Sequence, residues 1–190
     1  YTTYYVDSGT QGATGINGTR NGDGAAVSVT NSGDISADGI FGATGIAATS
    51  GGQGGTASVA NSGNIYVSQN QKYGYGAYGV VVSADGDASI DNSGLIAVYS
   101  GGAANGATAL SFAGDASVTN SGDIDVSNGA LLSYGAYGIV SFAANGDAMV
   151  DNSGSINATS SYLATAIDAR GFGDATVENS GSVYANGGKY

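Results

Sequence analysis

Apolar and polar residues alternate in short runs along this chain, and the same pattern returns with a period of about 30 residues. Each copy is centred on an Asn-Ser-Gly tripeptide, with Val or Ile two residues before every Asn and Ile or Val two residues after every Gly. Alternation with β-branched residues predicts strands, and Asn-Ser-Gly between two such runs predicts a corner. Each copy is therefore expected to form a strand, a corner and a second strand. The tripeptides begin at Asn31, Asn61, Asn92, Asn120, Asn152 and Asn179.

A third apolar segment follows in each copy after a loop of variable length. Residues 43–46 (Ala-Thr-Gly-Ile) and 136–139 (Ala-Tyr-Gly-Ile) are typical. Three short strands per copy are what one coil of a three-sided parallel β-helix needs. Stacked coils align equivalent residues about 4.8 Å apart, and together they bury a Val/Ile/Ala interior that one coil cannot bury. The other copies of this third segment are expected at 13–16, 77–80, 107–110 and 164–167.

We therefore predict an all-β fold, a right-handed parallel β-helix (β-solenoid) that forms a single domain over residues 1–190. It should contain about six coils, each with three strands of roughly five or six residues. The right hand follows the general bias of parallel crossovers. A β-propeller fits less well, because it needs four strands per blade and bulkier aromatic residues.

The six repeat asparagines share the parity of the inward Val or Ile before them, which places them at an inward corner. Stacked amides can hydrogen-bond along the axis, since each supplies two donor hydrogens and an acceptor oxygen. We predict such a ladder. The alternative role, in which Asn tolerates a left-handed corner conformation, is compatible with it. The ladder residues are Asn31, Asn61, Asn92, Asn120, Asn152 and Asn179.

Composition narrows the function classes. The chain has 35 Gly and neither Cys, His nor Trp, so few side chains for proton, metal or redox chemistry are present, and we expect no enzyme activity and no cofactor. Four basic residues against 15 acidic ones give a net charge of −11, which argues against nucleic acid as a partner. The longest apolar stretches, such as 79–82, are far shorter than the roughly 20 residues of a transmembrane helix.

Two motifs resemble a known family. Residues 114–124 (Gly-Asp-Ala-Ser-Val-Thr-Asn-Ser-Gly-Asp-Ile) and 135–139 (Gly-Ala-Tyr-Gly-Ile) look like the passenger repeats of bacterial autotransporter and filamentous-haemagglutinin-type surface proteins. The resemblance extends over nearly the whole chain. It implies extracellular or cell-surface display in bacteria, with adhesion, aggregation or biofilm roles and often no enzymatic activity in the helix itself. The first residues carry no signal segment, so we expect that it has been removed or that the chain is an excised piece.

The ends of a solenoid expose unpaired strand edges, which invite another chain. We therefore expect self-association end to end into a fibre. There are two alternatives to a fibre. The chain could be a segment of a longer surface adhesin, or a truncated piece whose ends pack in a crystal. The candidate end contacts are Tyr1, Tyr4, Tyr5, Tyr184 and Tyr190.

An acidic residue stands five positions before the Asn in four consecutive copies, so four carboxylates are expected to stack. Such a line must be solvated, bonded to turn N–H groups or bridged by a cation. Calcium suits oxygen ligands, yet the Gly-rich nine-residue calcium repeat is absent, and we favour turn capping. The weak metal candidates are Asp87, Asp115, Asp147 and Asp174.

Tyrosine is the abundant side chain with binding potential, and several tyrosines fall in or beside the variable loops. They are expected either to form an aromatic patch for a glycan or a cell-surface protein, or to cover the core beneath the loop. These residues are Tyr73, Tyr75, Tyr78, Tyr134, Tyr137 and Tyr162.

Two other functions are alternatives. An ice-binding β-helix would use a threonine column that we expect at Thr44, Thr108 and Thr165, although Tyr78 and Tyr137 interrupt it. The second alternative is a polysaccharide-binding or polysaccharide-cleaving β-helix, since parallel β-helices host those activities. Cleavage, however, usually needs paired carboxylates or a basic residue in a cleft. The sequence thus favours a non-catalytic structural or adhesive solenoid outside the cell.

Overall fold

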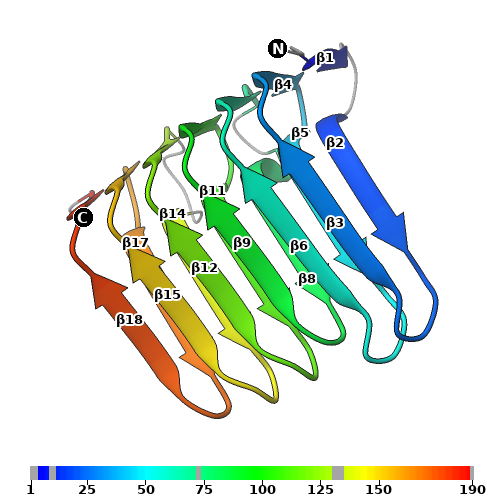
Figure 1. Ribbon diagram of the computed structural model, residues 1–190. Coiled ribbons are helices and arrows are strands. Elements are labelled where there is room, and N and C mark those ends of the chain that lie inside the picture. Colours follow the sequence, from blue (N-terminus) through cyan, green and yellow to red (C-terminus); the bar gives the residue numbers. More distant parts are fainter. Residues whose placement is uncertain (1–3, 9–11, 72–73, 130–134, 189–190) are drawn as a thin grey trace.

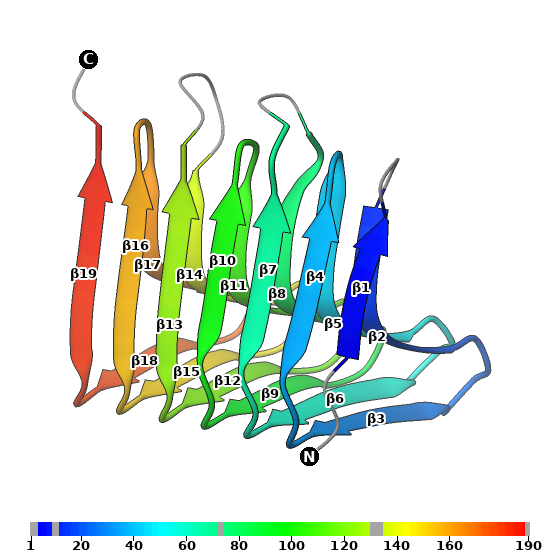
Figure 2. The same ribbon diagram turned by 90° about the horizontal axis from the view of Figure 1, so that it is seen from above.

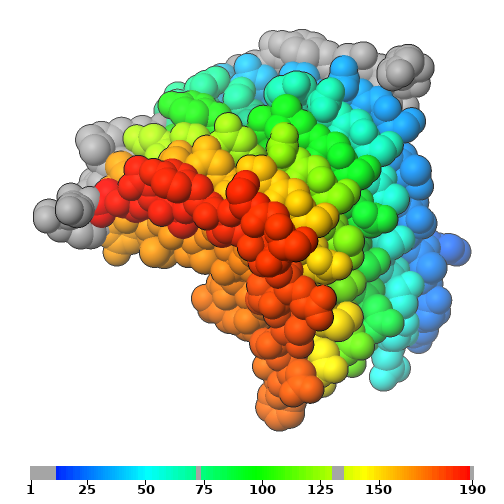
Figure 3. Space-filling model, turned by 60° about the vertical axis from the view of Figure 1, so that its left-hand side comes forward, coloured from blue at the N-terminus to red at the C-terminus, as the bar shows by residue number. Residues whose placement is uncertain are grey.

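The computed structural model describes residues 4–8, 12–71, 74–129 and 135–188, with side chains described from residue 12 onward. These residues form 19 β-strands in three parallel sheets. Successive strands belong to three different sheets, named A, B and C in chain order, and every third strand returns to the same sheet. Each strand therefore pairs with its counterpart one coil away (Figures 1 and 2). In Figure 3, where the C-terminal end faces the viewer, the chain winds counter-clockwise from orange to red as it approaches, which is a right-handed path. The predicted right-handed parallel β-solenoid is confirmed.

Each sheet forms one side of the solenoid. Sheet A contains β1 (Tyr4–Ser8), β4 (Ile35–Gly39), β7 (Ile65–Gln69), β10 (Ile96–Ser100), β13 (Asp123–Asn128), β16 (Ser155–Ser160) and β19 (Ser182–Gly187). Sheet B contains β2 (Gly12–Arg20), β5 (Gly42–Ser50), β8 (Gly76–Ala84), β11 (Ala104–Ser111), β14 (Ala136–Ala143) and β17 (Ala164–Gly171). Sheet C contains β3 (Ala26–Asn31), β6 (Thr56–Asn61), β9 (Ala88–Asn92), β12 (Ala116–Asn120), β15 (Ala148–Asn152) and β18 (Ala175–Asn179). No helix long and apolar enough to span a membrane occurs in the described ranges.

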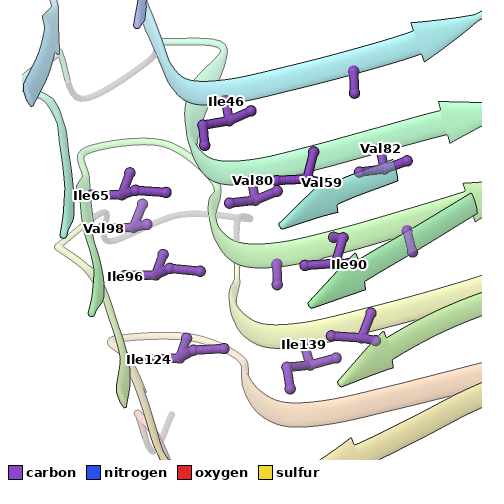
Figure 4. Close-up of a cluster of buried hydrophobic side chains, with 14 of the residues drawn as sticks. Ile46, Val59, Ile65, Val80, Val82, Ile90, Ile96, Val98, Ile124 and Ile139 are labelled. Atoms are coloured by element: carbon purple, nitrogen blue, oxygen red, sulfur yellow. The ribbon is translucent and has the colours of Figure 1, made fainter. Parts of the chain in front are cut away.

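The core consists of columns of like residues, as the repeat predicts. Ile65 pairs in register with Ile96, and Ile96 with Ile124. Figure 4 shows these three side chains one above another inside the coil. All three are at most 1 % exposed. The matching column on sheet C joins Val59 to Ile90. Equivalent positions in successive copies therefore stack directly, and burial of β-branched side chains in continuous columns stabilises the fold.

Sheet B departs from the expected short strands, since its strands are eight or nine residues long. The reason is a glycine in mid-strand. In β5 both Gly45 and Ile46 face the core, so the alternation of inward and outward side chains restarts at the glycine, as in a bulge. A Cβ on Gly45 would lie 2.4 Å from Cγ2 of Ile65 and 2.5 Å from the carbonyl oxygen of Gly79. Glycine thus lets two short segments bend into one strand over the isoleucine column.

The position of the glycine also shows that the expected alignment of one copy is wrong. Residues 107–110 are not the counterpart of 43–46. Instead Ala104 pairs with Ala77 and Ala136, and Gly106 takes the bend position. Asn105 therefore occupies the column of Thr44 and Tyr78, whereas Thr108 pairs with Val81 and Val140. The expected threonine column does not form, because the bend in β2, β5, β8, β11 and β14 places glycine over the isoleucine, and this packing fixes the register. In β17 the bend position is Ala166.

Candidate functional site

The corner between sheets C and A carries the six repeat asparagines in one line. In each, Nδ2 donates one hydrogen to the carbonyl oxygen of the glycine two residues later, for example Asn61 to Gly63 at 2.9 Å. The other hydrogen goes to Oδ1 of the asparagine on the next coil. These inter-coil distances are 2.7 Å from Asn31 to Asn61, 2.8 Å from Asn61 to Asn92, 2.8 Å from Asn92 to Asn120, 2.8 Å from Asn120 to Asn152 and 2.7 Å from Asn152 to Asn179. Both amide hydrogens of every asparagine from Asn31 to Asn152 are therefore bonded.

The main chains of successive coils are also in close contact at this corner. A Cβ on Gly122 would lie 2.1 Å from the carbonyl oxygen of Gly94, and one on Gly63 would lie 2.0 Å from that of Gly33. Glycine is needed here because successive corners touch through their main chains. The Asn-Ser-Gly tripeptide thus combines an amide that bonds along the axis with a residue that lets the next corner approach.

The ladder has a direction. At its N-terminal end, Oδ1 of Asn31 accepts the backbone N–H of Gly33 at 3.3 Å, whereas the same oxygen in Asn61 accepts the Asn31 amide. At its C-terminal end, Asn179 donates to the carbonyl oxygen of Gly181 at 3.1 Å and, within the described residues, to no further coil. One end therefore presents an acceptor and the other a donor.

The last described coil, β17 to β19, exposes side chains whose counterparts on the preceding coil are buried. Val177 is 49 % exposed, while Val150 in the same column is 2 % exposed. Val183 is 44 % exposed, while Ile156 beneath it is 1 % exposed. In the described sheets β17, β18 and β19 each pair along one edge only. Within the described residues, the last coil therefore has three unpaired strand edges and two exposed apolar residues in its core columns.

A second buried polar line runs along the corner between sheets A and B, and the sequence analysis missed it. Oε1 of Gln69 accepts the hydroxyl of Ser100 at 2.9 Å, and its Nε2 donates to the carbonyl oxygens of Ile40 and Gln71 at 2.6 and 2.8 Å. Asn128, on the next coil, donates to the carbonyl oxygen of Gly102. Each of these polar residues follows the first inward Ile of its strand by four positions, and that spacing could have revealed the line.

The four stacked aspartates lie at the turn between sheets B and C. The backbone N–H of Asp115 donates to Oδ1 of Asp87 at 3.0 Å, and that of Asp147 donates to Oδ1 of Asp115 at 2.9 Å. The N–H of Asp174 continues the series to Asp147 at 2.8 Å. All four residues are exposed, and the described residues contain no cluster of three or more acidic side chains that could hold a metal. Each of the first three carboxylates thus caps the turn of the next coil, while calcium binding stays a prediction.

The loop tyrosines do not gather into one described patch. Tyr75 lies between β7 and β8 and is 86 % exposed. Tyr78 and Tyr137 lie on the outer face of sheet B, half-buried, with Asn105 between them in the column. Tyr162 precedes β17 and is exposed. Tyr73 and Tyr134 lie outside the described residues.

The candidate end contacts are placed only in part. Tyr4 and Tyr5 belong to β1, where Tyr4 pairs in register with Ile35 of β4. Tyr184 lies in β19 and is exposed on the outer face of sheet A. Tyr1 and Tyr190 lie outside the described residues. Of these five residues, Tyr184 alone has a side chain that the structure describes.

The chain matches no protein-family model, no curated protein and no solved structure.

What the geometry offers is repeated bonding along one axis. The first three aspartates of the turn line accept backbone hydrogen bonds, and the ion pair between Arg170 and Asp168, at 2.6 Å, lies at the surface. Surface pairs of this kind contribute little to stability. The strongest polar feature is the buried asparagine ladder. Its last described donor, Asn179, lies on the same coil as the exposed Val177 and Val183.

Proposed function

We propose that this chain is a non-catalytic structural β-solenoid of the extracellular surface that lengthens by stacking coil on coil with further copies of itself. The observation that carries the proposal is the surface of the last described coil. There, Val177 and Val183 are about half exposed and Asn179 presents an amide donor along the axis. Covering that surface with an equivalent coil would bury the valines and extend the ladder by one bond.

The two ends of the ladder are complementary. Asn179 supplies a donor, and Asn31 supplies an acceptor oxygen whose described bond is the 3.3 Å contact with its own corner. The sheet C column that ends at Val177 begins at Val29, so an apolar residue meets an apolar residue when one copy stacks on the next. A head-to-tail contact of this kind uses two different surfaces and does not close, and it therefore propagates as a filament.

The strand count adds one requirement. In the part of the chain that the structure describes, sheet A contains seven strands, whereas sheets B and C contain six each. If β2 and β3 of an incoming copy pair with β17 and β18, its β1 arrives at the position that β19 already fills. One of these two strands must leave sheet A. We assign that role to β1, because it pairs with its neighbour over five residues and β19 pairs over six.

The extracellular setting is supported by composition and by the resemblance to bacterial passenger repeats. The chain contains no cysteine, so its stability is independent of the redox state of its surroundings. The same terminal surface would serve a segment of a surface adhesin, in which a further coil of the repeat covers it.

Light scattering over a range of protein concentrations, with electron microscopy of the same samples, tests the proposal. The wild-type chain is expected to form rods whose mass rises with concentration. Val177→Lys should remain monomeric, because the interface would bury an unpaired charge. Thr176→Lys is the matched control, since the neighbouring side chain points outward, and it should assemble like the wild type. A wild-type chain that stays monomeric at every concentration would contradict the proposal.

A further inference from the structure

The outer face of sheet A has a hollow between two exposed tyrosines on adjacent strands. Tyr66 of β7 pairs in register with Ala97, and Tyr99 of β10 pairs with Ser68. Each ring therefore stands beside a small residue on the neighbouring strand, and the two rings lie diagonally across the hollow. The resulting pocket has a volume of about 310 Å³. Sequence parity places both rings on this outer face, because each tyrosine directly follows an inward Ile or Val.

Both rings are available for contact. Tyr66 is 46 % exposed and Tyr99 is 50 % exposed, while Val67 and Val98 beneath the pocket are each 3 % exposed. The strand spacing and the two-residue offset place the Cβ atoms of the rings about 8 Å apart. The core fixes the backbone of both strands, so the rings are held on a rigid element, which favours binding at low entropic cost.

Polar groups surround the apolar floor. The hydroxyl of Ser68 donates to Oδ1 of Asp38 at 2.7 Å, so its oxygen retains the capacity to accept. Asp125 accepts the Asn157 amide on Oδ1 at 3.0 Å, while its Oδ2 has no partner within the described contacts. The remaining polar groups that line the pocket are Ser36 and Ser127. Two aromatic faces and several hydroxyl and carboxylate oxygens thus converge on one shallow site.

We propose that this pocket binds one neutral pyranose unit of a glycan. The C–H face of a sugar ring carries partial positive charge, which the negative face of an aromatic ring attracts, and its apolar area is covered at the same time. The sugar hydroxyls then donate to Asp125 and to the serine oxygens. Acidic sugars are disfavoured, because Asp125 lies at the rim and the whole chain has a net charge of −11.

The open shape of the site selects a glycan over a buried small molecule. The hollow lies on a sheet face, so the neighbouring units of a polysaccharide can continue along the surface without a clash. Asp125 supplies acceptor oxygens on the next strand, in register with Ala97. The site is distinct from the stacking surface of the terminal coil, so binding does not depend on assembly.

Saturation-transfer NMR and calorimetric titration with neutral malto-, cello-, chito- and galacto-oligosaccharides test the proposal, with polygalacturonate as the acidic comparison. At least one neutral series should bind, and Tyr66→Ala and Tyr99→Ala should each lower its affinity about tenfold or more. Tyr66→Phe should retain most of the affinity, because the ring face remains. Ala97→Leu should abolish binding by filling the hollow while both tyrosines stay in place.

Phe142→Ala is the control, since it removes an exposed aromatic ring from the outer face of sheet B. It should leave sugar binding unchanged, and the melting temperatures of all variants establish that they are folded. The proposal is overturned if no neutral oligosaccharide binds, if polygalacturonate binds better, or if the two tyrosine variants bind as tightly as the wild type.

Discussion

Asn152 donates one amide hydrogen to Oδ1 of Asn179 at 2.7 Å, and Asn179 is the last described member of that line. The same relationship links each repeat asparagine to the next. The ladder therefore stabilises the interior of the solenoid and leaves a donor at one end.

Breaking the middle of the ladder should destabilise the whole rod. Asn120→Ala removes the acceptor of the Asn92 amide and the donor to Asn152, both in a buried setting. Each buried group left without a partner costs about 1–3 kcal/mol, so we expect a total loss of about 2–5 kcal/mol in the free energy of unfolding. Urea denaturation of the wild type and the variant measures this difference.

Asn179→Ala is the control for that experiment. Asn179 is exposed and takes part in one inter-coil bond, from Asn152. Its loss should cost clearly less than that of Asn120, about 1 kcal/mol. Equal effects of the two substitutions would show that the ladder does not act as a buried network.

The glycine bend in sheet B should not accept a side chain. A Cβ on Gly106 would lie 2.5 Å from both Cγ2 of Ile124 and the carbonyl oxygen of Gly138. Overpacking of this kind costs about 1–3 kcal/mol or more, so Gly106→Ala should lower the melting temperature markedly. In Gly42→Ala, by contrast, the nearest atoms would lie 3.8 Å from the new Cβ, and this variant should melt close to the wild type. Thermal unfolding followed by circular dichroism compares them.

The stacked aspartates should act as turn caps. Asp115→Ala removes the acceptor of the Asp147 backbone N–H, and at this exposed turn we expect a loss of about 0.5–1.5 kcal/mol. Calcium at millimolar concentration should leave the melting temperature of the wild type unchanged. A rise that disappears in Asp115→Ala would instead establish a cation site on this line.

Removal of β1 should favour assembly. Among the described strands, sheet A has one more than sheets B and C, so in the proposed stacking β1 of an incoming copy leaves sheet A before its β2 and β3 can pair. A chain that begins at residue 12 avoids that step and is expected to form rods faster and at a lower concentration. Time-resolved light scattering of the full and shortened chains measures the effect. Slower assembly of the shortened chain would show that β1 contributes to the contact.

The sequence was sufficient to predict the fold because its columns are redundant. Every Val or Ile before the tripeptide and every Ile or Val after it obeys one rule, and the register Val59 to Ile90 or Ile65 to Ile96 follows from it. The same parity placed the repeat asparagines at an inward corner. Period-two patterns determine which face each residue occupies, and the repeat determines which residue lies above it.

Sheet B was harder to predict, because its alternation changes parity at a glycine. Counting from Ala107 placed Thr108 in the column of Thr44, whereas packing of Gly106 over Ile124 shifts that strand by three residues. The pocket between Tyr66 and Tyr99 was missed for a different reason. Parity places both rings on the outer face, but their diagonal arrangement, each opposite a small residue of the neighbouring strand, depends on the alignment of two strands, and no single repeat contains that information.

The most direct test of coil-on-coil stacking is an engineered disulfide between copies, which the absence of natural cysteine makes possible. Ser28 and Thr176 belong to the same outward column of sheet C, so in-register stacking brings them about 4.8 Å apart, within disulfide range. A chain carrying Ser28→Cys and Thr176→Cys should oxidise to a ladder of linked multimers on a non-reducing gel, whereas Ser28→Cys with Glu178→Cys should not. Monomers in both cases, or equal cross-linking of both pairs, would contradict the account.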